Sequence, residues 1–376
     1  MTQSTEPTSQ DGRMTTSNAP QPTASVVLPE PQHWARMGET AEANNDELET
    51  TEVSDGDSTL ASITSSILQY RTIHGRTYHS EQGNAQYWGS NDKQQNDLMD
   101  LTHHILTLGL GDKLHLAPVI KHDVKNVIDI GTGTGAYGLC KLLSSDKYRP
   151  LTENLSDFAD QYPEAQIIGT DLSPIQPSWI PPNLQFIIED CTWDWSFTSG
   201  FADYIHARWL MGSIRNWDSF FSEAFRVSKP GGWVESHEAA STISSDDNTV
   251  PPDSAMGHWG KFFIEGSKKI GTSFTVVEDG MQRKAMEKAG FVNIQEFDFR
   301  NPIGNWPDDP VEKQMGSYTK HGLETDSEGF VLFMAHTLGW SREDILAYVT
   351  QFKREIRSGK YHGYFAQKVV WGQKPN

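Results

Sequence analysis

The stretch that most constrains the fold of this chain is residues 126–138, Asn-Val-Ile-Asp-Ile-Gly-Thr-Gly-Thr-Gly-Ala-Tyr-Gly. Residues 127–130 are rich in β-branched apolar side chains, which is typical of a strand buried on both faces of a parallel sheet. A helix is predicted after the turn, from Ala136. The turn itself has glycine at every second position: Gly131, Gly133 and Gly135. Since glycine lets the backbone approach a ligand closely, this strand, turn and helix predict an α/β fold that binds a nucleotide-like ligand.

Asp129 helps to decide which ligand such a turn binds. The glycines at 133, 135 and 138 also fit the Gly-x-Gly-x-x-Gly pattern of dinucleotide-binding proteins, so the pattern alone leaves both classes open. A carboxylate just before the turn would repel a pyrophosphate, whereas it suits a ligand with an amino group or a sulfonium charge. We therefore expect S-adenosylmethionine rather than a nicotinamide dinucleotide. A Walker loop is excluded because no Gly-Lys-Ser/Thr follows.

Two further carboxylates are predicted at the ends of the next two strands. Asp171 closes the strand predicted over residues 166–170, where an acid commonly binds a ribose diol. Asp190 follows the strand predicted over residues 183–188, and a carboxylate there can accept a hydrogen bond from an adenine amino group. The alternative is that both are solvated loop acids. Their positions at successive strand ends favour binding to the cofactor.

Candidates for acid–base chemistry follow the fourth and fifth predicted strands. In an open α/β sheet, ligands and reacting groups gather outside the carboxyl ends of the strands. That rule selects His206 and, at the end of the strand predicted over residues 233–238, His237 or Glu238. His206 is a candidate general base for a hydroxyl acceptor. The alternative is that His206 and Arg208 only line the methionine end of the cofactor, and that His237 or Glu238 faces the helices.

Composition restricts the partners and the compartment. The formal charge is −19, from 31 basic and 50 acidic residues, and no basic run occurs, so no nucleic-acid or anionic-membrane surface is expected. The two cysteines, Cys140 and Cys191, indicate a reducing compartment without a disulfide framework. No signal peptide and no apolar run of membrane-spanning length is found. We expect a cytoplasmic or nuclear protein, and no metal, because His103 and His104 lack ligands at suitable spacing.

The chain divides into a polar tail and one larger domain. Residues 1–58 are rich in Ser, Thr, Pro, Gln and acids, and we expect them to be disordered and removable without loss of stability. Residues 59–376 form the domain, with N-terminal cap helices in 59–120 and a helical insertion in 301–360. Further helices are predicted over residues 92–108, 218–227 and 276–289 and around 258–263; further strands are predicted over 202–206, 291–299 and 364–371.

Blocks of sequence from about residue 60 to residue 375 resemble the fungal LaeA-like class of S-adenosylmethionine-dependent methyltransferases. The most specific block is Asp-Leu-Ser-Pro-Ile-Gln-Pro at residues 171–177. The other blocks are Tyr70-Arg71 with Gly-Arg-Thr-Tyr-His at 75–79, Tyr-Trp-Gly-Ser-Asn-Asp at 87–92, Ile-Asp-Ile-Gly-Thr-Gly-Thr-Gly at 128–135, Ile-His-Ala-Arg at 205–208, Lys-Pro-Gly-Gly-Trp at 229–233 and Gly-Gln-Lys-Pro at 372–375. Two departures are Ile73-His74, where the family usually has Glu-Asn, and the extra segment 144–160 after the glycine turn.

The resemblance implies a Rossmann-like, seven-stranded class I methyltransferase sheet with a reversed last strand. It implies S-adenosylmethionine over the ends of the first two strands and a substrate cap from the N-terminal helices and the late insertion. Cofactor contacts are also expected from Tyr78, Leu172, Cys191 and Arg208.

Three functions remain open from the sequence. The chain can be a methyltransferase acting on O, N or S of a small secondary metabolite, or a regulator of metabolite genes that binds S-adenosylmethionine and acts through protein partners. A nicotinamide-dependent enzyme is disfavoured by Asp129 and Asp190. The acidic tail favours the regulator. Aromatic residues predicted in the cap (Trp209, Trp217 and Trp306) favour a planar small substrate, although core packing also accounts for them.

Overall fold

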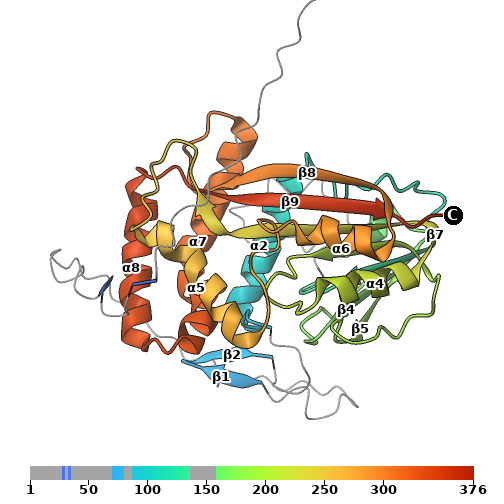
Figure 1. Cartoon of the computed structure of the whole chain (residues 1–376), viewed down its shortest axis with the longest axis horizontal. Coiled ribbons are helices and arrows are strands. Elements are labelled where there is room, and N and C mark those ends of the chain that lie inside the picture. Colours follow the sequence, from blue (N-terminus) through green and yellow to red (C-terminus); the bar gives the residue numbers. More distant parts are fainter. Residues whose placement is uncertain (1–27, 30–32, 35–69, 80–86, 136–157) are drawn as a thin grey trace, which may run out of the picture.

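The structure of this chain is a computed structural model that describes residues 28–29, 33–34, 70–79, 87–135 and 158–376 (Figure 1). Most of the predicted tail, the start of the predicted cap before Tyr70, the helix predicted from Ala136 and most of the extra segment 144–160 lie outside the described residues. The strands are β1 (Arg71–Ile73), β2 (Arg76–Tyr78), β3 (Asn126–Ile130), β4 (Gln166–Asp171), β5 (Leu184–Ile188), β6 (Ala202–Arg208), β7 (Ser228–Ser244), β8 (Val292–Pro302) and β9 (Tyr364–Gln373). The helices are α2 (Lys93–Gly109), α3 (Phe158–Gln161), α4 (Trp217–Val227), α5 (Ala255–Ile270), α6 (Met281–Ala289), α7 (Pro310–Thr337) and α8 (Arg342–Ser358).

Seven of the described strands form one sheet in the order β5-β4-β3-β6-β7-β9-β8 (Figure 1). Strands β3, β4, β5, β6 and β7 run parallel to one another, whereas β9 runs antiparallel to both β7 and β8. The predicted seven-stranded sheet with a reversed last strand is therefore confirmed. The strand order reverses at β3, which has β4 on one side and β6 on the other. In such a sheet the ligand crevice lies outside the carboxyl ends of the strands at this switch point.

Strand β3 is buried on both faces, as its β-branched run predicts. Ile128 and Ile130 belong to the larger hydrophobic core on one face of the sheet, and Val127 belongs to a smaller core on the other face. The exposed fraction of each of these three side chains is at most 1%. Because alternate residues face opposite sides of a strand, the run anchors β3 in both cores and fixes the glycine turn at its end.

Three predicted boundaries differ from the structure. The strand predicted over residues 233–238 is longer at both ends, because β7 runs from Ser228 to Ser244, and the helix predicted around residues 258–263 is the sixteen-residue helix α5. Helix α5 is capped by Ser254, whose side chain accepts the N–H of Gly257. The helix predicted from Val276 starts only at Met281. Its N-cap Gly280 has a φ of 60°, a left-handed conformation that interrupts a helix.

A cap packs beside the sheet and is built from the hairpin β1–β2 with helices α2, α5, α7 and α8 (Figure 1). The hairpin is not predicted by the sequence pattern, because its strands are only three residues long. Arg76 of β2 bonds the carboxylates of Asp92, the N-cap of α2, and of Asp326, where α7 has non-helical backbone angles. This one guanidinium therefore ties the hairpin to two helices of the cap.

One residue of the predicted tail, Trp34, packs against the folded domain. Its side chain is only 1% exposed and belongs to the larger core, although it lies within the predicted tail. The indole packs edge-on against His258 of α5 and Tyr348 of α8, with ring centroids 5.4 Å away in each case. A truncation that removes Trp34 therefore removes a core residue.

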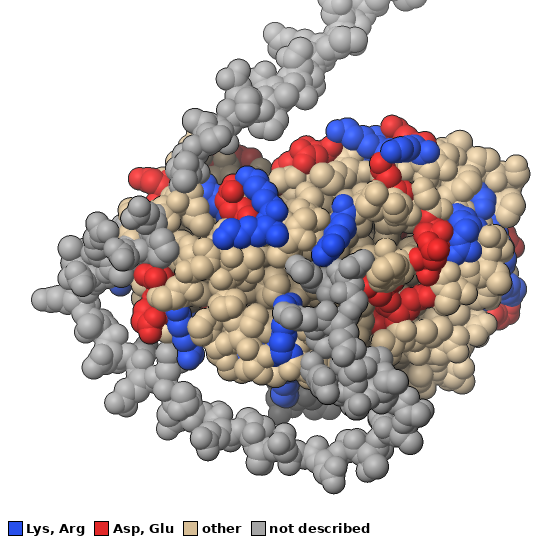
Figure 2. All heavy atoms as spheres, turned by 60° about the horizontal axis from the view of Figure 1, so that its bottom comes forward, with Lys and Arg blue, Asp and Glu red and all other residues tan. Residues whose placement is uncertain are grey.

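The described surface carries charges of both signs. On the face shown in Figure 2, acidic and basic side chains lie next to one another in small groups, with broad uncharged areas between the groups. Among the residues that the structure describes, no helix is long and apolar enough to cross a membrane.

Candidate functional site

The glycine turn after β3 adopts a conformation that side chains resist. Gly131, Gly133 and Gly135 all have left-handed φ angles, of 69°, 60° and 80°. A Cβ at Gly135 would also lie 2.6 Å from the ring of Phe186. The turn is held against β4, because the N–H of Gly133 donates to the Asp171 carboxylate at 2.8 Å. Glycine is required here by backbone conformation as well as by space.

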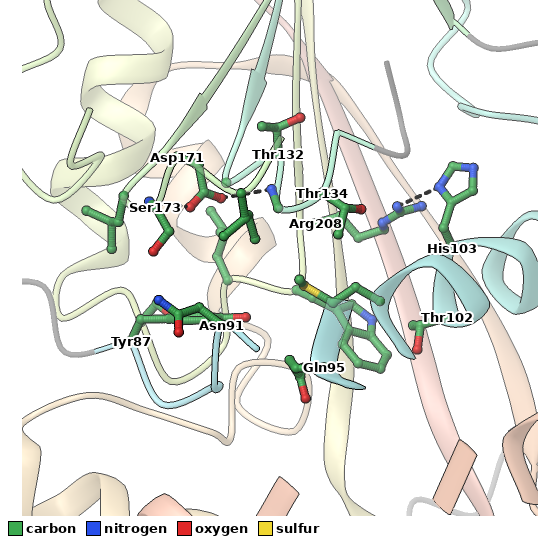
Figure 3. Close-up of a pocket in the computed structure, with 18 of the residues that line it drawn as sticks. Tyr87, Asn91, Gln95, Thr102, His103, Thr132, Thr134, Asp171, Ser173 and Arg208 are labelled. Carbon is green, nitrogen blue, oxygen red and sulfur yellow. Dashed lines mark hydrogen bonds between the residues drawn. The ribbon is translucent and has the colours of Figure 1, made fainter. Parts of the chain in front are cut away.

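The turn forms one wall of a cavity at the switch point of the sheet. The centre of a water-sized sphere can move through a volume of about 140 Å³ in this cavity. Figure 3 shows Asp171, Ser173 and Thr132 on one side of it. Tyr87 and Asn91, which precede α2, and Gln95 in the first turn of α2 lie on the other side. The carboxyl ends of β3, β4 and β6 and the helix α2 thus enclose the place where the fold puts a ligand.

Asp171 has a perturbed carboxylate. Burial raises its pKa to about 6, and the N–H groups of Ser173 and Gly133, which donate to it at 2.9 and 2.8 Å, partly offset that rise. A buried carboxylate with a raised pKa beside a cavity is a mark of a functional site. Hydroxyl groups of a ligand are suitable further donors to it.

Asp129 and His206 form a pair across neighbouring strands. They face each other in the register of β3 and β6, and Nδ1 of His206 lies 2.7 Å from Asp129 Oδ1. Thr132 donates its hydroxyl to the other carboxylate oxygen at 2.6 Å. Burial lowers the pKa of His206, and the bond to Asp129 only partly opposes this effect. The ring is therefore neutral near pH 7; with Nδ1–H donating to Asp129, the lone pair is on Nε2.

Arg208 brings positive charge to the same cavity. Its Nη2 lies 2.8 Å from Nδ1 of His103 on α2 (Figure 3). Because a guanidinium only donates hydrogen bonds, Nδ1 of His103 is the acceptor. Burial, and then the Arg208 charge, lower the pKa of His103 well below its ordinary value. The pair thus holds a single positive charge at the end of β6.

The structure brings most of the predicted site residues together. Eight of them line the cavity: Asp129, Gly131, Gly133, Asp171, Leu172, Cys191, His206 and Arg208. Four do not line it: Tyr78, Gly135, Asp190 and Glu238.

Those four residues have other contacts. Tyr78 is fully buried in the larger core, and Gly135 belongs to the turn described above. Asp190 accepts the N–H and the hydroxyl of Thr192 at 2.9 and 2.6 Å. Glu238 accepts the N–H groups of Leu210 and Met211 at 3.0 and 2.9 Å, and burial raises its pKa to about 8. His237, the other candidate after β7, is also fully buried, and burial lowers its pKa well below the ordinary value.

The three aromatic residues predicted in the cap have different surroundings. Trp209 lines the cavity. Trp217 packs in the hydrophobic core beside Phe220 and Phe221 of its own helix, as the packing interpretation expects. Trp306 stacks on His362, with ring centroids 5.3 Å apart. Only one of the three is therefore placed to meet a ligand of this cavity.

Sequence reasoning missed the contribution of α2 and the residues just before it. Ten such residues line the cavity: Tyr87, Trp88, Ser90, Asn91, Gln95, Leu98, Met99, Thr102, His103 and Leu106. Both polar atoms of the Asn91 amide are buried and have no hydrogen-bond partner among the described residues, so a ligand is a natural partner. The block at residues 87–92 was the available signal, but nothing in it indicates that it faces the glycine turn. No group of three potential metal ligands is found among the described residues.

Comparison with known proteins agrees with this geometry. A family model described as a methyltransferase domain matches residues 102–296. The methyltransferase pytC of Aspergillus terreus is 34% identical over 85% of this chain and 93% of its own length. The probable methyltransferase tdiE of Emericella nidulans is 31% identical over 75% of this chain and 82% of its own length. The secondary metabolism regulator LAE1 of Cochliobolus heterostrophus is 29% identical over 80% of this chain and 94% of its own length.

Proposed function

The chain belongs to the fungal LaeA-like family of methyltransferases, and we propose that it transfers the methyl group of S-adenosylmethionine to a small molecule of secondary metabolism. The observation that carries the cofactor proposal is that Asp129, Asp171 and Arg208 converge on one cavity. This set of charges complements an amino group, a ribose diol and a carboxylate, which S-adenosylmethionine carries together.

The residues of the cavity fit this cofactor. Asp171 would accept hydrogen bonds from the ribose hydroxyls, and Asp129 would face the amino group of the methionine part. Arg208 would bind its carboxylate, because guanidinium and carboxylate form strong charge-assisted hydrogen bonds. The glycine turn lets the backbone approach the cofactor closely. The unpartnered Asn91 amide supplies one more donor and one more acceptor.

S-adenosylmethionine supplies a methyl group on a sulfonium sulfur, which leaves as a neutral thioether when the methyl is transferred. The protein must then hold the acceptor atom in line with the methyl and exclude water. Such alignment contributes roughly 7–11 kcal/mol of barrier reduction. We propose His206 as the base for a hydroxyl acceptor, because it lines the cavity and carries its lone pair on Nε2. Proton removal adds about 10²- to 10⁴-fold.

Glu238 was a second candidate for the base. Its contacts to the N–H groups of Leu210 and Met211 favour a different role, in which it positions the segment after β6. We propose that Glu238 acts through this segment and that His206 takes the proton.

Calorimetry with S-adenosylmethionine and with NAD tests the cofactor. We expect the wild type to bind the first and not the second. Asp171→Ala should lose two charge-assisted hydrogen bonds, each worth about 1.5–3 kcal/mol. Asp194→Ala, which removes an exposed acid from the neighbouring loop, should bind as the wild type does. Absence of binding by the wild type, or full binding by Asp171→Ala, would contradict the proposal.

The base is tested by the pH dependence of the rate. His206→Ala should lower the rate by about 10²- to 10⁴-fold while retaining the cofactor. In the wild type the rate should fall as the pH drops through the lowered pKa of His206, because the protonated ring cannot accept a proton. That acidic limb should disappear in the variant. If cofactor affinity falls as much as the rate, His206 only builds the pocket.

The similarity to LAE1 supports a second candidate, a regulator that binds S-adenosylmethionine and acts through protein partners. Deletion in the source organism separates the two functions. Loss of one methylated metabolite with unchanged transcripts supports the enzyme. A coordinated fall in the transcripts of metabolite genes supports the regulator.

A further inference from the structure

A second cavity adjoins the one proposed for the cofactor. Five residues line both cavities: Trp88, Leu98, Thr102, Trp209 and Phe330. In the second cavity, the centre of a water-sized sphere can move through a volume of about 70 Å³. This is several times the ~10–15 Å³ that one water molecule needs, so a ring-sized group can enter it. An occupant of this cavity therefore meets whatever occupies the first.

The second cavity is apolar and rigid. Eight of the nineteen residues that line it are aromatic, and no Asp, Glu, Lys, Arg or His is among the described side chains that line it. Trp88 packs edge-on against Phe263 and Phe274, with ring centroids 5.6 and 5.3 Å away, and Trp259 packs edge-on against Phe330 at 5.9 Å. Rings that pack edge to face restrict one another's movement, so the walls do not collapse into the cavity. A charged group would lose its hydration here without gaining a partner.

Trp209 stands where the two cavities meet, and its backbone is strained. Its φ of 57° lies in the left-handed region, which a bulky side chain rarely adopts. Neighbouring groups hold this conformation, because the N–H of Trp209 donates to the backbone carbonyl of His237 at 2.9 Å and the Glu238 carboxylate accepts the N–H groups of Leu210 and Met211. Trp88 donates its indole N–H to the Met211 carbonyl at 3.0 Å. These hydrogen bonds hold the backbone of Trp209 in an unfavourable conformation and so fix the position of its ring.

Two polar atoms of the residues lining this cavity have no hydrogen-bond partner in the described part of the chain. They are the indole Nε1 of Trp209 and the hydroxyl of Ser241, and both are buried. A buried donor without a partner is costly, so a ligand that supplies an acceptor is favoured. An indole N–H donates and does not accept, so it selects an oxygen or another acceptor atom.

We propose that the apolar cavity binds the methyl acceptor, that the acceptor is an uncharged molecule with a flat apolar ring, and that Trp209 donates a hydrogen bond to an oxygen on that ring. This assignment rests on the proposed function, because the cavity receives an acceptor only if the neighbouring cavity holds the methyl donor. Trp209 is then a specificity-determining residue.

Equilibrium dialysis of the full chain with three naphthalene derivatives tests the chemistry of the cavity. The uncharged 2-naphthol should bind with a Kd below about 1 mM, and 2-naphthoate, which has the same rings and a negative charge, should bind at least tenfold more weakly. In 2-methylnaphthalene a methyl group replaces the hydroxyl, so it reports on ring burial alone. Equal binding of 2-naphthoate and 2-naphthol would overturn the uncharged specificity.

Trp209→Phe isolates the indole N–H. The variant should weaken 2-naphthol binding by about 3- to 10-fold, the effect of one neutral hydrogen bond. Binding of 2-methylnaphthalene should change by less than twofold, because no hydrogen bond to it is lost. If both ligands weaken equally, Trp209 acts only through packing and its assignment as a donor is wrong.

Ala240→Leu locates the bound probe, because Ala240 lines the apolar cavity and not the other. The larger side chain should weaken all uncharged probes at least tenfold, while Ala347→Leu on α8 should have no effect. Ala239→Val serves if Ala240→Leu does not fold. Unchanged probe binding would place the probe elsewhere and refute the inference.

Calorimetry with S-adenosylmethionine separates this inference from the proposed function. The affinity of Ala240→Leu for S-adenosylmethionine should stay within twofold of the wild-type value. A wild type that does not bind S-adenosylmethionine refutes the proposed function instead.

Discussion

The two adjoining cavities are built in opposite ways. The polar cavity takes its charged residues from the ends of neighbouring parallel strands, where the topology of the sheet alone brings Asp129, Asp171 and Arg208 together. The aromatic residues that line the apolar cavity are spread over the sequence from Trp88 to Phe365, and packing of the cap brings them together. The difference shows that the polar cavity follows from strand order, whereas the apolar cavity depends on how the cap is anchored.

The largest effect expected from breaking that anchor is in Arg76→Ala. The substitution leaves the carboxylates of Asp92 and Asp326 without their guanidinium, and Asp326 is only 2% exposed. Loss of one partner of a buried ion pair costs about 3–5 kcal/mol of unfolding free energy. Urea unfolding measures the change. Arg300→Ala, which breaks more exposed pairs with Asp246 and Glu312, should cost less than about 1 kcal/mol. Equal losses would show that Arg76 does not anchor the cap.

A smaller effect is expected from Trp34→Ala. The indole fills a place in the core between α5 and α8, so its removal should cost about 3 kcal/mol. The 84% exposed Trp179 is the matched control, and Trp179→Ala should change stability by less than about 0.5 kcal/mol. Thermal unfolding compares the two variants. A stable Trp34→Ala protein would restore the expectation that the whole tail is dispensable.

The smallest effect concerns Glu238, which holds the segment between the two cavities. Its pKa is about 8 in the folded chain, so the folded state keeps a proton that the unfolded state releases above about pH 4.5. The stabilisation from that retained proton is complete below pH 4.5 and is lost as the pH rises toward 8. Between pH 6.5 and 7.5 it should fall by about 1 kcal/mol, within the limit of 1.4 kcal/mol per pH unit for one proton.

Glu238→Gln should remove this slope, because glutamine does not titrate. Urea unfolding at pH 6.5, 7.0 and 7.5 gives the difference from the wild type, and the exposed Glu287→Gln on α6 is the control. The comparison of variants also removes the contribution of the histidines, whose lowered pKa values act in the opposite direction below pH 6.5. An identical slope in wild type and Glu238→Gln would contradict the raised pKa.

Local patterns in the sequence predicted the strands and most of the charged residues of the polar cavity, whereas the seven-stranded sheet with its reversed last strand was implied by the family resemblance. The run before Gly131 identifies a buried strand, and Asp171 ends the next one, so their meeting follows from parallel order alone. The same rule predicted that Gly135 and Asp190 contact the cofactor, but neither residue lines the cavity. Spacing in the sequence does not specify in which direction a side chain or a backbone segment faces.

The acceptor cavity could not be predicted in this way. Trp88, Phe274 and Phe330 come to line one cavity only because segments far apart in the sequence pack together. An aromatic residue in a sequence gives no sign of whether it lines a cavity or fills a core. Trp34 was missed for a related reason. A single apolar residue in a polar stretch has no periodicity, so the composition of its surroundings outweighed it.

The place of β9 in the sheet has a consequence for the order in which the molecule assembles. Strand β9 lies between β7 and β8, yet both of those strands precede it in the chain. At ~5–20 residues per second, the ribosome needs about 3–12 seconds to proceed from Pro302 to Tyr364. During that interval β8 has no neighbour in the sheet and one edge of β7 is unpaired, while α7 and α8 are being made. Unpaired edges invite pairing with other chains, so the nascent protein is most exposed to aggregation just before its sheet closes.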